Sequence, residues 1–204
     1  LVGSEMCIRD SGPTHQPVEH IMSLRNIPNL LVFRPSDSFE TFCCFKTIMK
    51  HTKSPSAILL TRQKLPKLDI DQEQIEEGVS KGAYILKKEE DPDAIIFTSG
   101  SEAHLALDIC NEISSKIQVV NIPCWELLDE QDKNYTSSIM LKECKKRISL
   151  EAGVTLGWEK FTGIDGINIG VNEFGESAPG QDVAKHLGFV KEKIISRIKD
   201  YLNE

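Results

Sequence analysis

The chain has 204 residues, which is enough for one large domain or two small ones with a core that can sustain folding. Its hydrophobic share of 40% and its charged share of 27% are ordinary for a globular protein in water. The formal net charge of −7 argues against a nucleic-acid partner or an anionic membrane surface. Because no apolar run approaches the roughly 18 residues of a membrane span, we expect no membrane partner either.

The N-terminal end of the chain contains a stiff loop. Pro13 and Pro17 bracket His15, so its imidazole is expected on a non-helical segment suited to hydrogen bonding or proton handling. A loop histidine that only caps backbone groups is the alternative interpretation. Residues 1–11 (LVGSEMCIRDS) are short, mixed and interrupted by charges, unlike a secretory signal. We expect them to be a non-native segment, with a genuine unusual N-terminus as the alternative.

A strand–helix–strand unit follows the loop. Residues 29–34 (NLLVFR) and 56–61 (SAILLT) are apolar runs typical of buried strands, and a helix is predicted between them over residues 38–51. Asp37 and Glu40 have the spacing of a capping pair at the start of this helix. Such units normally form parallel sheets that carry functional sites at the carboxyl ends of their strands.

The composition then changes between residues 64 and 82. A polar, weakly patterned stretch rich in glutamate predicts a connector, and we place a domain boundary near residues 66–78. The first domain is therefore expected over residues 12–70, a linker over 71–78 and a second domain over 79–204.

The second domain is predicted to alternate strands with helices, which places the chain in the α/β class. The predicted strands cover residues 82–86, 94–97, 117–122, 147–151 and 166–171, and the predicted helices cover 103–113, part of 127–138, 181–187 and the segment from 190 onward. The turn at residues 98–101 precedes a helix and could receive an anion, but Ser101 acting as an ordinary helix cap is the favoured alternative.

Cysteine usage indicates a reducing compartment. The six cysteines are Cys7, Cys43, Cys44, Cys110, Cys124 and Cys144. Their spacing forms no C-x-x-C pair and no zinc pattern. We expect free thiols, and adjacent Cys43 and Cys44 are interpreted as small buried hydrophobes of the helix.

Several segments together resemble one enzyme family. Residues 12–20 (GPTHQPVEH) are similar to the signature loop of transketolases, thiamine-diphosphate enzymes that move two-carbon ketol units between sugar phosphates. Four further segments occur in the family's order, namely LTRQ at 60–63, TSGSE at 98–102, EAG at 151–153 and FGESAP at 174–179. The resemblance spans residues 12–204, about the last third of a transketolase. It implies the end of a pyrimidine-binding α/β domain followed by a smaller α/β C-terminal domain with a mixed sheet.

The resemblance also implies site residues. His15 would be the catalytic and substrate-binding histidine, donating a hydrogen bond to the reacting end of the sugar as charge develops on its oxygen. Arg62, at the end of the second predicted strand, would bind the terminal phosphate with its planar guanidinium, a surface ion pair being the alternative. His20 is expected to face away from the site. Ser11 stands where the family has an aspartate that recognises a sugar hydroxyl. Glu176 of the FGESAP segment is interpreted as part of a packing or subunit-contact loop, without a catalytic role.

Transketolases use thiamine diphosphate with Mg²⁺ or Ca²⁺. The Gly-Asp-Gly…Asn segment that holds this metal does not occur in the sequence, and residues 163–166 (GIDG) have the surroundings of the C-terminal domain. The glutamate that tunes the aminopyrimidine is not found either. We therefore expect no cofactor-binding or metal-binding residue in this chain, and most ligands of both groups outside it.

The family also implies the setting of the parent enzyme: a cytoplasmic homodimer of the pentose phosphate pathway that binds sugar phosphates, with a plastid location left open. The intact enzyme would pass a two-carbon unit from a ketose phosphate to an aldose phosphate. A second hypothesis belongs to another class of function. In it, the chain is a catalytically inert fragment that acts only as a dimerisation or regulatory α/β domain.

Overall fold

The computed structural model describes residues 16–61 and 63–203. The helices in chain order are α1 (His20–Arg25), α2 (Ser38–Lys50), α3 (Gln72–Lys81), α4 (Glu102–Cys110), α5 (Trp125–Asp129), α6 (Lys133–Met140), α7 (Glu159–Thr162), α8 (Gly180–His186) and α9 (Lys191–Leu202). The strands are β1 (Leu31–Phe33), β2 (Ser56–Ile58), β3 (Tyr84–Lys87), β4 (Ala94–Thr98), β5 (Ile117–Asn121), β6 (Lys146–Leu150) and β7 (Ile167–Ile169).

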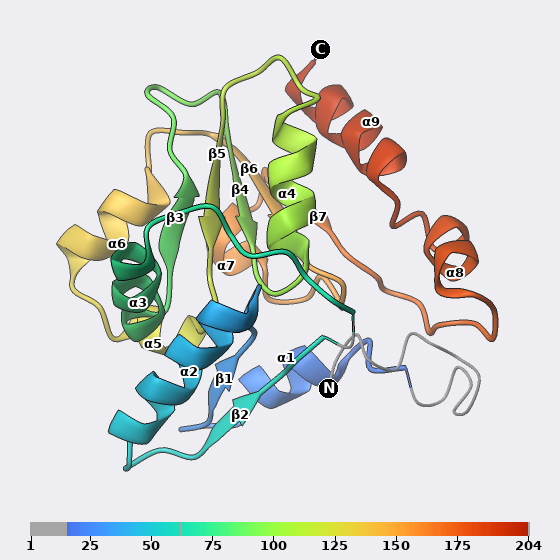
Figure 1. Ribbon diagram of the computed structural model, residues 1–204. Coiled ribbons are helices and arrows are strands. Elements are labelled where there is room, and N and C mark those ends of the chain that lie inside the picture. The colour runs from blue at the N-terminus through green and yellow to red at the C-terminus, as the bar shows by residue number, and fades with distance from the viewer. Residues whose placement is uncertain (1–15, 62, 204) are drawn as a thin grey trace.

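The first sheet is the parallel pair β1–β2, with a helix on each face (Figure 1). Side chains alternate across a strand, so Val32 packs with Ile21 of α1 while Phe33 on the other face joins Cys43 and Cys44 of α2. The predicted parallel strand–helix–strand unit and the two buried cysteines are therefore confirmed.

Helix α2 begins as the sequence predicts. The Asp37 carboxylate accepts a hydrogen bond from the backbone N–H of Glu40 at 2.7 Å, which satisfies a donor that the helix cannot pair internally. The Glu40 side chain departs from the usual capping pair, because it accepts from the backbone N–H of Ser36 rather than from that of Asp37. This leaves its carboxylate deep in the interior.

Two segments in the first half of the chain differ from the local structure that their sequence predicts. The stretch 71–78, predicted as a linker, lies largely within helix α3, which buries Ile75, Gly78 and Val79. Its place between two domains stays a prediction. Its many glutamates lie mostly on the outer face of the helix. In the sequence they obscure the pattern of the narrow apolar stripe that is buried. Strand β2 ends at Ile58 and is only half-buried along its length, although its apolar sequence predicts a buried strand.

The second sheet has five strands in the order β3–β5–β4–β6–β7, with β3 antiparallel to β5 and the other pairs parallel. This is the mixed sheet that the sequence resemblance implies, and the α/β class is confirmed. Helix–strand alternation explains the parallel pairs. Each crossover returns the chain to the end of the sheet where the previous strand began, so the next strand runs in the same direction. The short helix α7 is an element that sequence reasoning missed.

Side chains on the two faces of the second sheet belong to two different hydrophobic cores. Ile96 and Ile148 point to the face covered by α4 and α9, and this core continues without a break to α2 and β1. Ile95 and Phe97 point to the opposite face, where α5, α6 and α7 pack. The first sheet and the second domain thus share one hydrophobic core. Within the described part of the chain, no helix is long and apolar enough to cross a membrane.

Candidate functional site

The carboxyl ends of β1 and β2 face an open cavity of about 390 Å³. Asp37 and Thr41 line it from the start of α2, and Thr61, Gln63 and Lys64 line it from the segment after β2. Both predicted site residues, His15 and Arg62, lie outside the described residues. The structure describes the chain on both sides of position 62, and the Oγ1 of Thr61 is buried without a hydrogen-bond partner among the described atoms.

The residue that follows His15 is anchored by the FGESAP segment. The Gln16 side chain is buried, and its Nε2 donates a hydrogen bond to the backbone carbonyl of Glu176 at 3.0 Å, across 160 positions of sequence. A Cβ on Gly175 would lie 1.2 Å from Gln16 Oε1, so a larger residue at position 175 would displace the end of the Gln16 side chain. The Glu176 contact uses the backbone and leaves its side chain exposed.

The C-terminal domain also supports the rest of this loop. The backbone N–H of Val154 donates to the carbonyl of Val18 at 3.1 Å. His20, at the start of α1, has 57% of its side chain exposed and lies 3.5 Å from the carboxylate of Glu19. The structure thus brings residues 16–18 against two loops of the second domain and leaves His20 at the surface.

A buried ion network lies where β1, β4 and β6 end. The Arg34 guanidinium lies 2.6 Å from Glu102 and 3.2 Å from Glu151, and both Nη atoms of Arg25 contact the Glu151 carboxylate at 2.8 and 2.9 Å. All four side chains are at most 7% exposed. Arg25 also stacks 3.9 Å from the centroid of the Trp125 ring.

The charges of this network determine how its groups titrate. Burial works to raise the pKa of the Glu151 carboxyl, but the neighbouring Arg25 and Arg34 outweigh burial and lower this pKa to about 2. Burial works in the same way to lower the pKa of Arg34, yet Glu102 and Glu151 outweigh it and raise that pKa. Glu151 therefore stays ionised in the fold, and it binds α1 and the end of β1 to the second domain.

The network occupies the turn at residues 98–101. The Ser99 hydroxyl donates to Glu151 at 2.6 Å, and a Cβ on Gly100 would lie 2.9 Å from the Arg34 side chain. Ser101 is the helix cap position, as predicted, but its hydroxyl donates to the Glu102 carboxylate instead of accepting from the backbone. The Arg34 guanidinium fills the space beside this helix start, so the anion-receiving alternative has no support.

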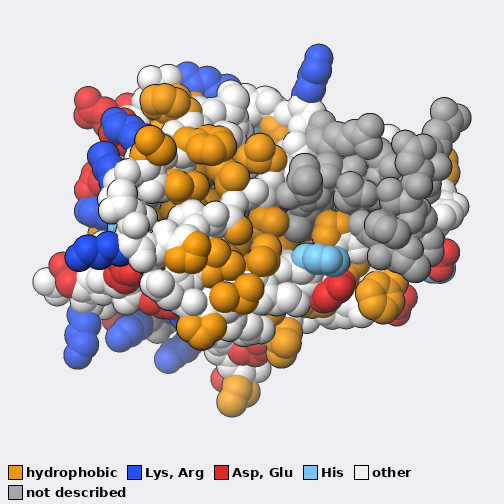
Figure 2. Space-filling model, turned by 90° about the horizontal axis from the view of Figure 1, so that it is seen from below, with side chains coloured by type: hydrophobic (Ala, Val, Ile, Leu, Met, Phe, Trp, Pro, Cys, Tyr) orange, Lys and Arg blue, Asp and Glu red, His pale blue; other side chains and the backbone are white. Residues whose placement is uncertain are grey.

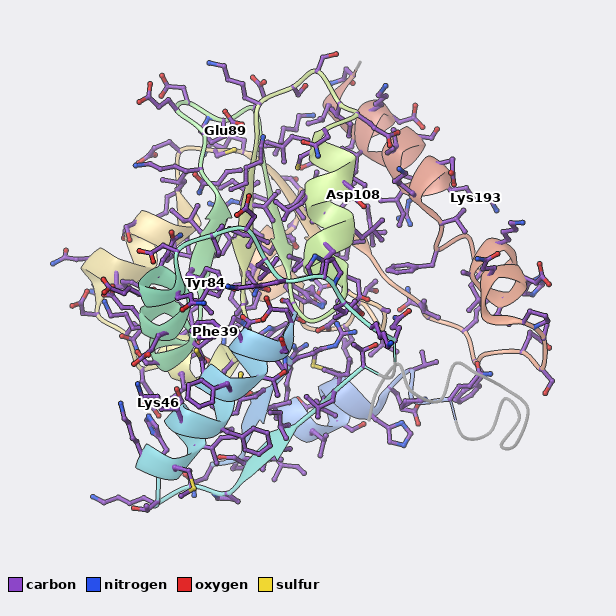
Figure 3. The ribbon with its side chains drawn as sticks, in the orientation of Figure 1. Phe39, Lys46, Tyr84, Glu89, Asp108 and Lys193 are labelled. Carbon is purple, nitrogen blue, oxygen red and sulfur yellow. The ribbon has the colours of Figure 1, made fainter. Side chains whose placement is uncertain are left out.

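A second buried cluster lies between α2 and the second sheet. The Glu40 carboxylate accepts hydrogen bonds from the Tyr84 hydroxyl at 3.0 Å and from Asn121 Nδ2 at 2.7 Å. Figure 3 labels Tyr84 on β3 and Phe39 on α2, the strand and the helix that contribute to this cluster. Burial raises the pKa of Glu40 to about 7, despite the hydrogen bonds from Ser36 and Tyr84 that lower it.

The described residues do not form the ligand set of a metal centre. Among them, no three or more His, Cys, Asp or Glu side chains are grouped so that they could hold a metal ion. The buried carboxylates of Glu40, Glu102 and Glu151 are already engaged by neighbouring side chains or backbone.

Sequence reasoning missed the residues of both buried clusters. A signal was available for two of them, because Arg34 and Glu151 are each the last residue of a predicted strand. A charge at the carboxyl end of a buried strand is held in the interior and needs a partner. The identities of the partners, Arg25 and Glu102, depend on how distant segments meet and could not be found in the pattern.

Comparisons with known proteins agree with this geometry. Residues 82–190 match the family described as transketolase-like TK C-terminal domain, and residues 3–67 match the transketolase pyrimidine-binding domain. The second match begins within residues 1–11, whose non-native origin stays a prediction. Helix α3 occupies most of the gap between the two matched regions.

The relatives are transketolases of greater length. The chain is 42% identical to the Aquifex aeolicus transketolase over 93% of this chain and 28% of the relative. It is 37% identical to the Bacillus subtilis transketolase over 98% of this chain and 31% of the relative. A solved Pichia stipitis transketolase in complex with sedoheptulose 7-phosphate matches with a TM-score of 0.88 and 31% identity, covering 99% of this chain and 29% of the other.

The chain thus spans about 30% of the length of the curated relatives it matches. Both matched regions occur in the order that the sequence motifs predict, and together they cover most of the described fold. The chain belongs to the transketolase family.

Proposed function

We propose that this chain supplies the sugar-binding part of a transketolase, which transfers a two-carbon ketol unit from a ketose phosphate to an aldose phosphate. The observation that carries the proposal is the anchoring of Gln16, next to His15, by Gly175 and Glu176. Two motifs that are far apart in the sequence meet there, as expected if the first is held as a rigid loop. A rigid loop can keep a histidine in place while charge develops on a sugar oxygen.

In this proposal, His15 binds the reacting end of the sugar and Arg62 binds its phosphate. The open cavity beside Thr61 and Gln63 supports the second assignment, because it lies next to position 62 at the carboxyl ends of the strands. The solved Pichia stipitis relative is a complex with a sugar phosphate, sedoheptulose 7-phosphate. An arginine matches a phosphate with a charged planar fork, which a neutral side chain cannot do.

The proposal includes the dependence of the transketolase family on thiamine diphosphate and on Mg²⁺ or Ca²⁺. Bound thiamine diphosphate supplies the carbanion chemistry, and the protein orients the sugar around it. In this proposal the residues of this chain contribute by binding and orienting the sugar. A homodimer, the pentose phosphate pathway and a cytoplasmic location are the setting that the proposal includes.

A covalent chimera tests the proposal. Residues 12–204 replace the matching region of the Bacillus subtilis transketolase, and ketol transfer from xylulose 5-phosphate to ribose 5-phosphate is measured with thiamine diphosphate and Mg²⁺. We expect an active chimera and a loss of activity in its His15→Ala variant. A folded but inactive chimera would contradict the proposal and favour the inert-fragment hypothesis. The same assay on the 204-residue chain alone is expected to give no turnover.

A further inference from the structure

Glu40 lies where the first part of the chain meets the second domain. It belongs to α2, yet its carboxylate accepts hydrogen bonds from the Tyr84 hydroxyl of β3 at 3.0 Å and from Nδ2 of Asn121, the last residue of β5, at 2.7 Å. Its exposed fraction is 0%. The side chain is therefore a direct and fully buried link between α2 and the second sheet.

The same carboxylate holds the turn that precedes α2. Its second oxygen, Oε2, accepts a hydrogen bond from the backbone N–H of Ser36. The Ser36 hydroxyl lies 3.1 Å from Asn121 Nδ2, and the Ser36 carbonyl lies 3.0 Å from Nε2 of His104 on α4. We call Ser36, Glu40, Tyr84 and Asn121 the Glu40 cluster. Every polar group of Ser36 is engaged by this cluster or by α4, so the position of the turn depends on them.

The turn borders the cavity at the carboxyl ends of β1 and β2. Pro35 and Asp37, the neighbours of Ser36 in the sequence, both line that cavity. The Asp37 carboxylate also accepts from the backbone N–H of Leu68 at 2.8 Å, which ties the turn to the segment that follows the cavity-lining residues 63–65. A displacement of Ser36 would therefore move both of its neighbours and change the shape of the cavity.

The charged form of Glu40 has no cation to balance it. Among the described residues, no arginine or lysine forms an ion pair with Glu40, whereas Glu151 contacts two arginines. Lysine and arginine side chains stay toward the margin of the face that α2 and β2 form, and the middle of this face is mostly hydrophobic or uncharged (Figure 2). Burial without a cation raises the pKa of Glu40 to about 7, so its carboxyl group changes ionisation near neutral pH.

The other titratable groups around the cluster do not supply a balancing charge. The groups that face Glu40 or its partner Ser36 come from the turn, from α2, from β3 and from α4, and they are Asp37, Cys44, Tyr84 and His104. Asp37 is an anion that works to raise the pKa of Glu40. Burial raises the pKa of the Cys44 thiol and of the Tyr84 hydroxyl well above their ordinary values, so both stay neutral. The imidazole contacts the backbone carbonyl of the turn. The cluster therefore loses its charge through protonation of Glu40 itself.

The hydrogen-bond inventory of Asn121 favours the protonated form of Glu40. Its Nδ2 lies within 3.1 Å of three oxygens, those of Ser36, Glu40 and Tyr84, but carries only two hydrogens, while its Oδ1 is buried without a partner among the described atoms. A half-turn of the amide places Oδ1 at the position of Nδ2, which is 2.7 Å from Glu40 Oε1 and 3.1 Å from Ser36 Oγ. There it accepts from the Ser36 hydroxyl and from a protonated Glu40. An ionised Glu40 has no proton to donate to it.

We propose that Glu40 is a positioning residue for the sugar phosphate and that it acts through its proton. The protonated carboxyl group joins α2 to the second sheet and holds the turn at Ser36, so that Pro35 and Asp37 keep the cavity in shape beside position 62. Loss of the proton leaves a buried charge, which draws water into the Glu40 cluster and loosens the turn. The inference rests on the proposed function, because it requires that this cavity receives the phosphate of the substrate.

The pH dependence of KM in the active chimera tests this role. KM for ribose 5-phosphate is measured at a series of pH values on both sides of 7, and glycolaldehyde serves as an acceptor without phosphate. We expect the ratio of the first KM to the second to rise by at least about fivefold as the pH passes 7, because only the phosphate depends on the cavity. The amide of the Glu40→Gln variant cannot ionise, so its ratio should rise less. The substrate phosphate titrates identically with both proteins, so the difference between them isolates Glu40.

Two further variants separate positioning from a structural effect. Tyr84→Phe removes a hydrogen bond that lowers the pKa of Glu40, so the rise in the KM ratio should move to a higher pH. Glu76→Gln removes an exposed ion pair with Lys46 and should leave the ratio and its pH dependence as in the parent chimera. If Glu40 only stabilised the fold, Tyr84→Phe would not shift the profile.

Infrared spectroscopy of the 204-residue chain tests the proton directly and needs no activity. Below pH 7 the parent should show the C=O stretching band of a buried protonated carboxyl group, which disappears as the pH rises through 7 and is absent from the Glu40→Gln variant. The inference would be overturned by the lack of this band, by the same KM profile in the parent and Glu40→Gln chimeras, or by an equal rise in KM for glycolaldehyde. A folded but inactive chimera contradicts the proposed function itself, and the positioning role falls with it.

Discussion

Arg25 and Glu151 form a two-point ion pair, with distances of 2.8 and 2.9 Å, between the first helix and the end of β6. They lie 126 positions apart in the sequence, and each side chain is only 2% exposed. The Glu151 carboxylate also accepts hydrogen bonds from Ser99 and Trp158, whereas the buried Nε of Arg25 has no partner among the described atoms. The ion pair fixes the loop-bearing first part of the chain to the second domain.

Replacing Glu151 by glutamine should destabilise the protein strongly. The change leaves Arg25 and Arg34 charged and buried without their shared partner, which costs about 3–5 kcal/mol in the free energy of unfolding. Urea denaturation measures this loss. The control is Glu112→Gln, which removes an exposed ion pair with Lys191 and should change stability by less than about 1 kcal/mol. Equal effects of the two variants would refute the proposed role of the network.

Stability should also depend on pH through two opposed carboxyl groups. Glu151 has a folded pKa of about 2, below the ordinary value of 4.5, so its contribution is present above 4.5 and is lost as the pH falls through 2. Glu40 has a folded pKa raised to about 7, so its contribution is present below 4.5 and is lost as the pH rises through 7. Their combined contribution is therefore greatest near pH 4.5 and falls on either side.

The Glu40→Gln variant isolates the second of these effects. A shift from 4.5 to about 7 corresponds to on the order of 3 kcal/mol, lost as the pH rises from 4.5 to beyond 7. Glutamine cannot ionise, so the variant should lose little stability over this range. Urea denaturation at a series of pH values gives the comparison. If the variant showed the same decline as the parent protein, Glu40 would not be its source.

Two glycines with positive φ provide a matched test of packing. Gly82 has a φ of 89° and a Cβ there would lie 2.3 Å from the backbone nitrogen of Leu128. Gly163 has a φ of 72° and open space around it. Gly163→Ala should cost about 1 kcal/mol from backbone strain alone. Gly82→Ala should cost at least about 2 kcal/mol more, since rigid backbone must move. Thermal unfolding of both variants measures the difference, and equal losses would contradict the crowding at Gly82.

Gly175→Ala should impair sugar binding more than stability. The added Cβ displaces the flexible end of Gln16, so the fold loses about 1 kcal/mol or less. The loop that carries His15 would shift with Gln16, and in the active chimera KM for the ketose phosphate should rise by on the order of tenfold. Gly163→Ala serves as the control and should leave KM unchanged. An unchanged KM for the Gly175→Ala variant would show that Gln16 does not help to position the substrate.

Much of this fold could be predicted from the sequence because its signals are local. Apolar runs located both sheets, and Asp37 marked the start of α2. Helix α3 was missed because its apolar stripe of Ile75 and Val79 is narrow and surrounded by glutamates. The half-exposure of β2 was also missed, since a strand's own sequence predicts that it is covered but not which segment covers it.

Only those parts of the candidate site that belong to a recognisable sequence motif could be predicted. The resemblance identified the loop of His15 and the position of Arg62, yet it gave no reason to pair Gln16 with Glu176. The buried partners of Arg34 come from the start of α4 and the end of β6, so their meeting depends on the tertiary fold. Short-range spacing carries no information about such contacts.

The most direct test of the central claim, that this chain binds the sugar phosphate, is the steady-state kinetics of the active chimera with Arg62→Leu. We predict that KM for ribose 5-phosphate rises by at least about tenfold, because a charged hydrogen-bonding fork is lost from the phosphate. KM for glycolaldehyde, an acceptor without phosphate, should stay unchanged, as should kcat. An equal rise in KM for both acceptors, or no rise for either, would contradict the account.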